Sequence, residues 1–575
     1  MKKLLPYLRP DLRESIVGPL LKLAEAGLDL LVPLLVASLI DVGVAGGDRA
    51  YILRMALLMA GLGALGLLFS VTAQYFCAKA AVGFTSRVRS ALFSHIQTLS
   101  HAELDRLGAS TLLNRMTGDL NQVQTGLNLS LRLLLRSPFV VFGSMILAFT
   151  VNARAAVWFA VVIPVLFAVV FAVMLTCIPL YRKVQQRLDA LTRAVGENLH
   201  GVRVLRAFGL ERQEADGFSE KADAHERSQV FVGRISALLN PVTYVIVNLA
   251  VVAVLRTGAV RVDLGEATQG EVIALYNYMA QILVELVKLA NLILNITRSL
   301  ACAGRVSAVL DVRSSLPAGT ACPDWEGSAP ALELENVSFR YPDAQAESLQ
   351  EITLSLPQGK TLGVIGGTGS GKSTLAALVP RFYDAVSGTV RVFGQDVSAC
   401  DPESLRSGLG IVPQRAQLFA GTVRENLLWG NAGASDEELW QALEAAQAAQ
   451  FVSEKESGLD HRLEAGGGNL SGGQRQRLTI ARALVRRPKL LILDDSASAL
   501  DFATEAALRA ALRALPWKPA VLLISQRTGS MQQADAILVL EDGRMAGYGT
   551  HEELLKTSPV YREIHDSQFR KEAGR

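Results

Sequence analysis

Six long apolar segments in the first half of the chain constrain its fold more than any other feature. They cover roughly residues 15–40, 51–77, 133–151, 156–180, 237–255 and 272–292. Each is close to the ~20 residues that an α-helix needs to cross the hydrocarbon core of a bilayer. Half of the chain is hydrophobic and its mean hydropathy is +0.28, more than the cores of a soluble two-domain protein require. The sequence therefore predicts a bundle of six transmembrane α-helices.

The connectors between these segments alternate between short and long. Residues 78–132 and 181–236 form the long connectors, which are charged and rich in helix-favouring residues. We expect them to extend the membrane helices into the cytoplasm. The chain begins with the basic residues Lys2, Lys3, Arg9 and Arg13. Such a start favours a cytoplasmic N-terminus, and an even number of crossings then places the C-terminal half in the cytoplasm as well.

A glycine-rich motif in the second half follows a short apolar run at residues 361–365, which is typical of a β-strand. The motif fits the phosphate-binding pattern G-x-x-x-x-G-K-[ST] and comprises Gly366, Gly367, Thr368, Gly369, Ser370, Gly371, Lys372 and Ser373, followed by Thr374. Glycines let backbone N–H groups approach phosphate oxygens, Lys372 reaches the β- and γ-phosphates, and Ser373 ligates Mg²⁺. A plain glycine-rich turn would leave the strand, the lysine and the serine unexplained. We therefore predict a site for ATP and Mg²⁺.

Two further motifs lie downstream of this loop. A second apolar run, residues 490–493, ends in Asp494, as expected for a parallel strand that delivers a carboxylate to the magnesium shell. Before it, the sequence Leu-Ser-Gly-Gly-Gln at residues 470–474 runs into a helix-compatible stretch. Alone this pentapeptide would mean little, but at this distance before the strand it is similar to the signature of ABC ATPases. The serine and the backbone amides of that signature bind a γ-phosphate at a helix N-terminus.

With these motifs in order, the chain resembles the ABC transporter family, and its six spans before one ATPase domain resemble the exporter type of half-transporter. The resemblance implies a transmembrane domain at residues 1–300, a linker at 301–330 and an α/β P-loop ATPase domain at 331–575. It implies that Tyr341 stacks on adenine, where a plain strand-end tyrosine is the alternative. Gln414 matches the glutamine that senses Mg²⁺ and the γ-phosphate, and Asp501 lies in the loop that crosses between paired ATPase domains.

Pairing of two ATPase domains head to tail is a further implication of this resemblance. Each composite site then takes its phosphate loop from one chain and its signature from the other. The signature residues that act on the partner's nucleotide are Ser471, Gly472, Gly473 and Gln474. Residues 111–119 and 206–218 also resemble the regions around the coupling helices that dock on ATPase domains. Amphipathic helices with solvated charges would explain either segment equally well.

Two positions depart from the family pattern. Asp495 stands where the family has a catalytic glutamate, and Gln526 stands where it has a histidine. The aspartate is one methylene shorter, and a displacement of about 1 Å can lower a rate roughly a hundredfold. Glutamine can donate a hydrogen bond to a phosphate but does not become a cation near neutral pH. Each change alone would be compatible with an active site. Both together predict a chain that binds ATP, hydrolyses it slowly and pairs with a non-identical half-transporter carrying the glutamate and the histidine.

The nature of the cargo is less constrained. Glu25 and Asp29 lie four residues apart in the first span and are candidates for an acidic cavity that favours cationic amphiphiles, although pairing with Arg132, Arg136 or Lys288 explains them as well. The leading hypothesis is a multidrug or lipophilic-compound exporter subunit in a bacterial cell membrane. A lipid or peptide exporter and an ATP-binding regulatory subunit are the alternatives. A net charge of +3 without a basic tract gives no indication of nucleic-acid binding.

Overall fold

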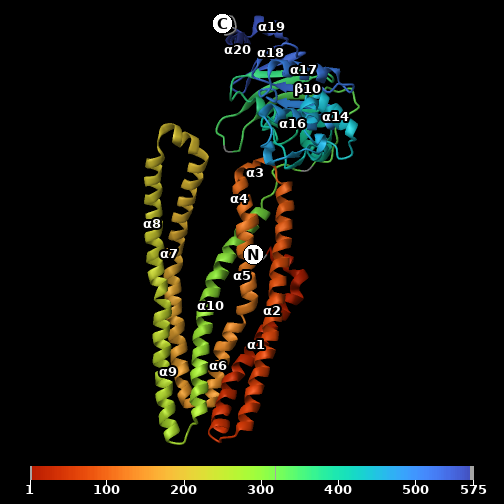
Figure 1. The fold of residues 1–575 in the computed structure, drawn as a ribbon. Helices are drawn as coiled ribbons and strands as arrows, with labels where there is room; N and C mark the ends of the chain where they lie inside the picture. Colours follow the sequence, from red (N-terminus) through yellow and green to blue (C-terminus); the bar gives the residue numbers. More distant parts are fainter. Residues whose placement is uncertain (1–2, 318, 343, 570–575) are drawn as a thin grey trace. The chain divides into compact units, whose positions relative to one another are not determined.

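The computed structural model of the protein describes residues 3–317, 319–342 and 344–569 (Figure 1). Lys2, one of the basic residues that favour a cytoplasmic N-terminus, lies outside the described residues. The chain divides into two compact units. The first, here called the membrane unit, comprises Met1–Gln97 and Ala109–Val312, and the second, the ATPase unit, comprises Thr98–Gly108 and Arg313–Arg575.

The membrane unit is entirely helical. Its principal helices are α1 (Leu12–Ser38), α2 (Arg49–Thr98), α5 (Leu120–Leu133), α6 (Arg136–Val151), α7 (Ala153–Phe208), α8 (Glu211–Ala237), α9 (Leu239–Asp263) and α10 (Gln269–Leu310). Short helical segments join or precede them, namely η1 (Leu5–Asp11), η2 (Leu39–Val44), α4 (Ala109–Asn114) and η3 (Arg115–Asp119). In the described chain six helical stretches are long and apolar enough to cross a membrane. The predicted bundle of six transmembrane helices is therefore confirmed.

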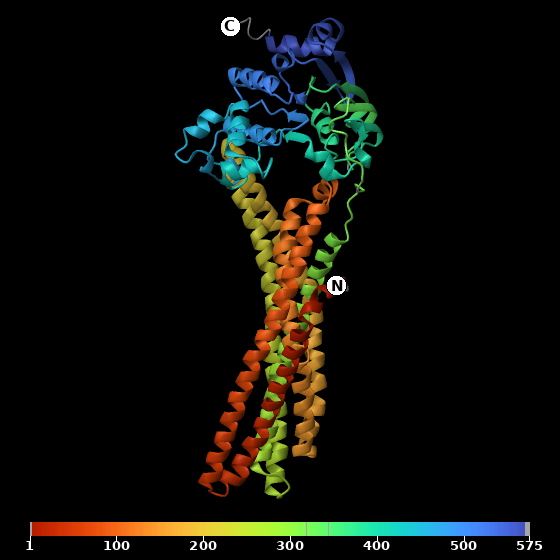
Figure 2. The ribbon, with the colours of Figure 1, turned by 90° about the vertical axis from the view of Figure 1, so that its right-hand side faces the viewer.

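Several of these helices are much longer than a bilayer crossing requires. α7 has 56 residues, which at 1.5 Å per residue is on the order of 80 Å, against about 30 Å for the hydrocarbon core. α7 and α8 run side by side as an antiparallel pair, joined at Gly209, whose φ of +64° ends α7 in a left-handed turn (Figure 1 and Figure 2). The polar connectors thus form helices that continue the membrane helices, as expected. α10 runs to Leu310, so the segment predicted as a linker from residue 301 begins as helix.

The ATPase unit is built around a six-stranded sheet with the order β12-β11-β3-β10-β9-β6. Its strands are β3 (Thr361–Gly366), β6 (Leu409–Val412), β9 (Leu490–Asp494), β10 (Ala520–Ile524), β11 (Ala536–Glu541) and β12 (Arg544–Gly549). All neighbouring strands pair in parallel except β11 and β12. The strands are nearly continuous apolar runs because both faces of a parallel sheet are buried. Along β9, Leu491 and Leu493 pack in one core cluster, while Leu490 and Ile492 pack in the other.

The two faces of this sheet are covered differently. One is covered by a four-stranded antiparallel sheet with the order β2-β1-β4-β5, formed by β1 (Leu332–Phe339), β2 (Leu349–Leu356), β4 (Ser387–Val392) and β5 (Gln395–Asp396). A two-stranded sheet pairs β7 (Gly421–Thr422) with β8 (Arg462–Leu463). The helices are α11 (Lys372–Leu378), α12 (Pro402–Ser407), α13 (Val423–Leu428), α14 (Asp436–Ala445), α15 (Ala449–Ser453), α16 (Gly472–Val485), α17 (Phe502–Ala514), α18 (Thr528–Met531), α19 (His551–Thr557) and α20 (Pro559–Phe569). The α/β P-loop architecture expected from the sequence is confirmed.

A short helix from the first long connector belongs to the ATPase unit. This helix, α3 (His101–Leu107), begins at a capping box formed by Ser100 and Glu103. The His101 ring stacks on Phe382 with 4.3 Å between ring centroids, and the Tyr383 hydroxyl donates a hydrogen bond to Asp105 Oδ2 at 2.6 Å. The sequence suggested residues 111–119 as the region around a docking helix. The helix that contacts the ATPase fold is α3, which lies just before that region.

Candidate functional site

The loop between β3 and α11 has a backbone shape that only glycine fits at two positions. Gly371 has φ +96°, and a Cβ there would lie 2.5 Å from the Ser348 carbonyl oxygen. A Cβ on Gly366 would lie 2.2 Å from the Leu540 carbonyl oxygen. The loop therefore wraps tightly between a strand end and a helix N-terminus, with backbone N–H groups available to an anion.

Lys372 is the buried cation of this loop. It is 8% exposed, and its Nζ donates hydrogen bonds to the carbonyl oxygens of Gly366 (2.9 Å) and Gly367 (2.6 Å). Burial lowers the pKa of the Lys372 ammonium, while the carboxylates of Asp494 and Asp495 act in the opposite direction. A buried ammonium facing a loop of backbone amides fits a phosphate chain, which would supply the negative charge that the loop lacks.

Oxygen ligands suited to a hard divalent cation meet beside Lys372. The Ser373 hydroxyl donates to Asp494 Oδ1 at 3.0 Å, and the Gln414 side-chain amide donates to Asp495 Oδ2 at 3.5 Å. Burial raises the pKa of the Asp494 carboxyl, and the nearby Asp495 charge raises it further. A hydroxyl, a carboxylate and an amide at this point fit Mg²⁺, since that ion prefers oxygen ligands and favours ionised carboxylates.

A cavity of ≈ 350 Å³ brings the predicted residues together. It is lined by Tyr341, Ser348, Thr368, Gly369, Gly371, Lys372, Ser373, Thr374, Gln414, Asp494, Asp495, Ile524 and Gln526. Ser348 and Ile524 were not predicted, because neither belongs to a sequence motif. Gly366, Gly367 and Ser370 belong to the loop but do not line the cavity, and neither do the signature residues 471–474. We call this space the nucleotide cavity.

Tyr341 lies at the wall of the nucleotide cavity within an aromatic cluster. Its hydroxyl is 3.2 Å from Thr374 Oγ1, and its ring packs edge-on against Phe339 and Tyr383 at 4.9 and 5.3 Å between ring centroids. Tyr383 is also the residue that binds Asp105 of α3. The same aromatic cluster therefore contacts both the nucleotide cavity and the docked helix.

Asp495 sits in an unusual backbone conformation. Its φ is +45°, and its N–H donates to the Ile524 carbonyl oxygen at 3.0 Å. Aspartate tolerates this left-handed conformation better than most residues. Burial raises the pKa of its carboxyl, although the Gln414 hydrogen bond acts in the opposite direction. The structure therefore places a short, partly buried carboxylate at the position that the family fills with glutamate.

The backbone at Gln526 is held by the last described helix. Gln568 of α20 donates from Nε2 to the Gln526 carbonyl oxygen at 2.7 Å. Its Oε1 accepts from Thr528 N at 2.8 Å and from Thr528 Oγ1 at 2.9 Å. Sequence reasoning missed Gln568, since a single amide in a polar C-terminal helix carries no motif.

The signature and the Asp501 loop are preorganised by helix caps. Ser471 is the N-cap of α16, where its Oγ accepts from Gln474 N at 3.2 Å and its N–H donates to Gln474 Oε1 at 3.0 Å. Asp501 is the N-cap of α17 and accepts from Thr504 N at 2.9 Å. Arg527 donates to the Leu500 carbonyl oxygen at 3.2 Å, which connects the Asp501 loop to the segment of Gln526.

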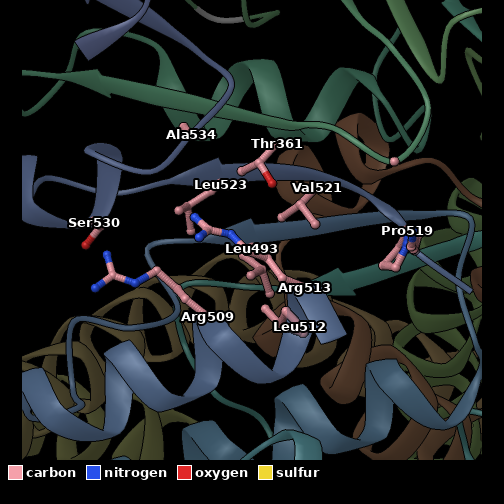
Figure 3. A pocket seen from close by; sticks show the side chains of 12 residues that line it. Thr361, Leu493, Arg509, Leu512, Arg513, Pro519, Val521, Leu523, Ser530 and Ala534 are labelled. Atoms are coloured by element: carbon pink, nitrogen blue, oxygen red, sulfur yellow. The ribbon is translucent and has the colours of Figure 1, made fainter. Parts of the chain in front are cut away.

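A second, smaller cavity of ≈ 110 Å³ lies in the ATPase unit and shares no lining residue with the nucleotide cavity (Figure 3). Arg509 and Arg513 of α17 both line it (Figure 3). Arg509 donates to the Gly529 carbonyl oxygen at 2.9 Å, and Arg513 donates to the Gln533 carbonyl oxygen at 2.8 Å. These arginines serve to fix the chain that follows Gln526.

Glu25 and Asp29, the predicted acidic cavity residues, both have basic partners. Glu25 pairs with Lys22 at 2.5 Å and Asp29 pairs with Arg136 at 2.9 Å. Arg136 also binds Glu285, whose side chain is 4% exposed, at 2.5 Å. The Asp29–Arg136 pair is one that the pairing alternative named, whereas Lys22, the partner of Glu25, was not among the residues it named. Compensated charges of this kind are what a bundle interior requires.

The chain is similar to known proteins over nearly its whole length. Residues 15–286 match the family described as ABC transporter transmembrane region, and residues 349–498 match the family described as ABC transporter. An uncharacterized ABC transporter ATP-binding protein of Mycobacterium tuberculosis is 37% identical over 98% of this chain and 97% of its own length. An ATP-dependent lipid A-core flippase of Pectobacterium atrosepticum is 31% identical over 99% of this chain and 97% of its own. A solved structure of a bacterial Atm1-family ABC exporter with ATP bound has a TM-score of 0.81 at 25% identity, covering 97% of this chain and 98% of that one.

Proposed function

The chain belongs to the ABC transporter family as an exporter-type half-transporter, and on this premise we propose that it is the slow-hydrolysing subunit of a heterodimeric exporter. The observation that supports the proposal is the composition of the nucleotide cavity. Residues of an intact phosphate loop, among them Lys372 and Ser373, line it together with Asp495 and Gln526. Two side-chain changes at the hydrolytic positions of one cavity favour impaired turnover with retained binding.

In this proposal the chain's own residues hold nucleotide without hydrolysing it quickly. Lys372 and the loop amides bind the phosphates, Tyr341 contacts the base, and Ser373, Gln414 and Asp494 hold Mg²⁺. Mg²⁺ when bound would neutralise charge on the phosphate oxygens. Asp495 reaches less far toward an attacking water than a glutamate, and Gln526 supplies a neutral donor. ATP would then stay bound at this site through several transport cycles.

The partner would be a second, non-identical half-transporter with the consensus glutamate and histidine. Residues 471–474 of this chain complete the partner's site, where most hydrolysis takes place. ATP binding at both sites would hold the ATPase domains together and turn the membrane cavity outward, and hydrolysis at the partner's site would reset it. A purely regulatory subunit would not need a preorganised signature, and α16 has one.

The cargo class proposed is a lipophilic or amphiphilic small molecule moved across a bacterial cell membrane, with the N-terminus and the ATPase unit in the cytoplasm. The relative that acts as a lipid A-core flippase makes lipid export the second candidate. Peptide export is a further alternative, but no contact among the described residues supports it. Nucleic acid is not among the proposed partners.

ATP turnover of the purified chain, alone and with a half-transporter that carries the consensus glutamate and histidine, tests the proposal. We expect the chain alone to be nearly inert and the pair to hydrolyse ATP. Replacing the catalytic glutamate of the partner subunit by glutamine should then abolish turnover. Brisk hydrolysis by the chain alone as a homodimer would overturn the proposal, since Asp495 would be an adequate base.

A further inference from the structure

A cavity of ≈ 1060 Å³ lies within the membrane unit and has not been given a role above. It is lined by residues of α4, η3, α5, α7, α8 and α10, among them positions 178–189 of α7 and 294–305 of α10. These positions lie at or just beyond the C-terminal ends of the apolar stretches 156–180 and 272–292 that the sequence predicts as spans. The cavity therefore lies at the cytoplasmic ends of the spans, at the level where lipid headgroups meet water.

The walls of this cavity carry an excess of positive charge. The guanidinium-bearing lining residues are Arg115, Arg182, Arg298 and Arg305. Arg115 and Arg305 share one carboxylate, that of Asp119, at 2.8 and 2.5 Å.

The other two arginines lack such compensation. Among the described residues no ion pair is formed by Arg182 or Arg298, and Arg298 lies 5.7 Å from the centroid of the Tyr181 ring. Asp189 is the one acidic residue among the described lining, and its Oδ1 accepts from Gln185 at 3.0 Å. Two guanidinium groups are therefore available to an anion.

One buried polar atom of the cavity wall also has no hydrogen-bond partner within the described chain. His225 Nδ1 is buried and has no hydrogen-bond partner among the described residues. A buried polar atom left in this state is unfavourable, and a ligand oxygen could satisfy it if that nitrogen carries the proton. Apolar side chains of Ile178, Val184 and Leu294 line the same space. The walls thus combine arginines that suit a phosphate with surface that suits a hydrocarbon.

We propose that this cavity binds the phosphate-bearing headgroup of an amphiphilic cargo, with Arg182 and Arg298 as its principal contacts. Arginine presents paired N–H donors that match phosphate oxygens, and such charge-assisted bonds are stronger than neutral ones. This inference rests on the proposed export function and names its cargo class as anionic. It replaces the cationic cargo that Glu25 and Asp29 suggested, since both of those acids are paired within the bundle.

The experiment measures binding of short-chain phosphatidic acid to the full chain with its partner in neutral detergent. Dioctanoylglycerol, which lacks the phosphate, inorganic phosphate and the cationic dye rhodamine 6G are the comparison probes. We expect Arg182→Gln with Arg298→Gln to weaken phosphatidic acid binding at least about tenfold. Lys183→Gln with Arg193→Gln removes the same charge from exposed positions of α7 outside the cavity lining and should leave binding unchanged.

Each other outcome decides against part of the inference. Equal weakening by both double variants would show a general charge effect and overturn the site. Inorganic phosphate binding as tightly as phosphatidic acid would show a simple anion site and overturn the amphiphile. Tighter binding of rhodamine 6G than of phosphatidic acid to the wild type would restore a cationic cargo.

The same measurements separate this inference from the proposed function. Absence of phosphatidic acid binding in a pair that hydrolyses ATP would overturn the cargo class and leave the heterodimer standing. Binding that depends on the two arginines but never stimulates ATP turnover would support the site and count against export. Unchanged ATP binding by the variants shows that they fold.

Discussion

The two ends of the nucleotide cavity differ in how they are built. At one end, Gly371 of the phosphate loop is required by backbone contacts, and Lys372 is fixed by carbonyl oxygens. At the other end lie Asp495 and Gln526, which in our proposal act through the reach and charge of their side chains. If the proposal holds, nucleotide binding depends on backbone geometry and one buried cation, whereas the turnover rate depends on the side chains of residues 495 and 526. The comparison teaches that a few substitutions can remove hydrolysis without disturbing the fold of the binding loop.

Removal of the buried cation should have the largest effect. We expect Lys372→Met to weaken ATP binding by about a hundredfold, because several charge-assisted contacts to phosphate are lost. Isothermal titration with Mg-ATP measures the change. Lys360→Met removes an exposed lysine that pairs with Asp535, and it should leave affinity unchanged. Equal affinity in the wild type and Lys372→Met would show that the loop is not the phosphate site.

A substitution in the signature tests whether residues 471–474 of this chain complete the partner's nucleotide site. We expect Ser471→Arg to abolish most turnover of the pair, at least about tenfold, while ATP affinity of the chain's own nucleotide cavity stays the same. Ser435→Arg is the matched control, because Ser435 also caps a helix through a capping box. Both variants lose about 1 kcal/mol of cap stability, so a thermal unfolding scan should not separate them. Similar turnover in the two variants would contradict the role of the signature.

Restoring the consensus residues at positions 495 and 526 should raise the ATP turnover rate. The background for this test is the pair in which glutamine replaces the partner's catalytic glutamate. In that pair, Asp495→Glu combined with Gln526→His should raise the ATP turnover rate by roughly ten- to a hundredfold. A phosphate-release assay measures this rate. Asp495→Glu alone should give part of the gain. An unchanged turnover rate in the double variant would mean that residues 495 and 526 do not limit the rate of hydrolysis.

The pH dependence of protein stability and of Mg-ATP affinity should show a smaller effect. Burial raises the pKa of Asp494 above its ordinary value of 3.8, so the nucleotide-free fold is favoured while this carboxyl is protonated. The free energy of unfolding without nucleotide should therefore fall as pH rises from below 3.8 through the raised pKa. Mg-ATP affinity should rise over the same interval, because Mg²⁺ needs the ionised carboxylate. Asp494→Asn should reduce both slopes, and steeper slopes in this variant would contradict the assignment.

The contact between α20 and the Gln526 segment should have the smallest effect. We expect Gln568→Ala to increase hydrogen exchange of the Thr528 amide and to destabilise this segment by about 1 kcal/mol, since its acceptor is lost. Turnover of the pair should change only slightly. Ser567→Ala is the control, because the Ser567 hydroxyl donates within its own helix to Ile564. Unchanged exchange at Thr528 would show that Gln568 does not hold the segment.

Sequence reasoning succeeded where the signal is local. Segment length and apolarity predicted the membrane helices, and several of the residues that the glycine, lysine and aspartate motifs marked lie together in one cavity. It failed where a feature depends on residues far apart in the chain. Arg136 binds Glu285, a pair that was not predicted, and Gln568 binds the backbone 42 positions earlier. Periodicity also does not mark the end of an amphipathic helix, so α10 extends beyond the predicted boundary to Leu310.

The placement of α3 has a consequence for dissecting the protein. Thr98–Gly108 belongs to the ATPase unit, while the chain on both sides of it belongs to the membrane unit. A fragment that starts at Arg313 therefore lacks the surface that His101 and Asp105 provide to Phe382 and Tyr383. Two aromatic side chains would then face water, and such a fragment should aggregate more readily than one supplied with the α3 peptide in trans. Truncation at the boundary between the two domains in the sequence therefore removes part of the ATPase unit.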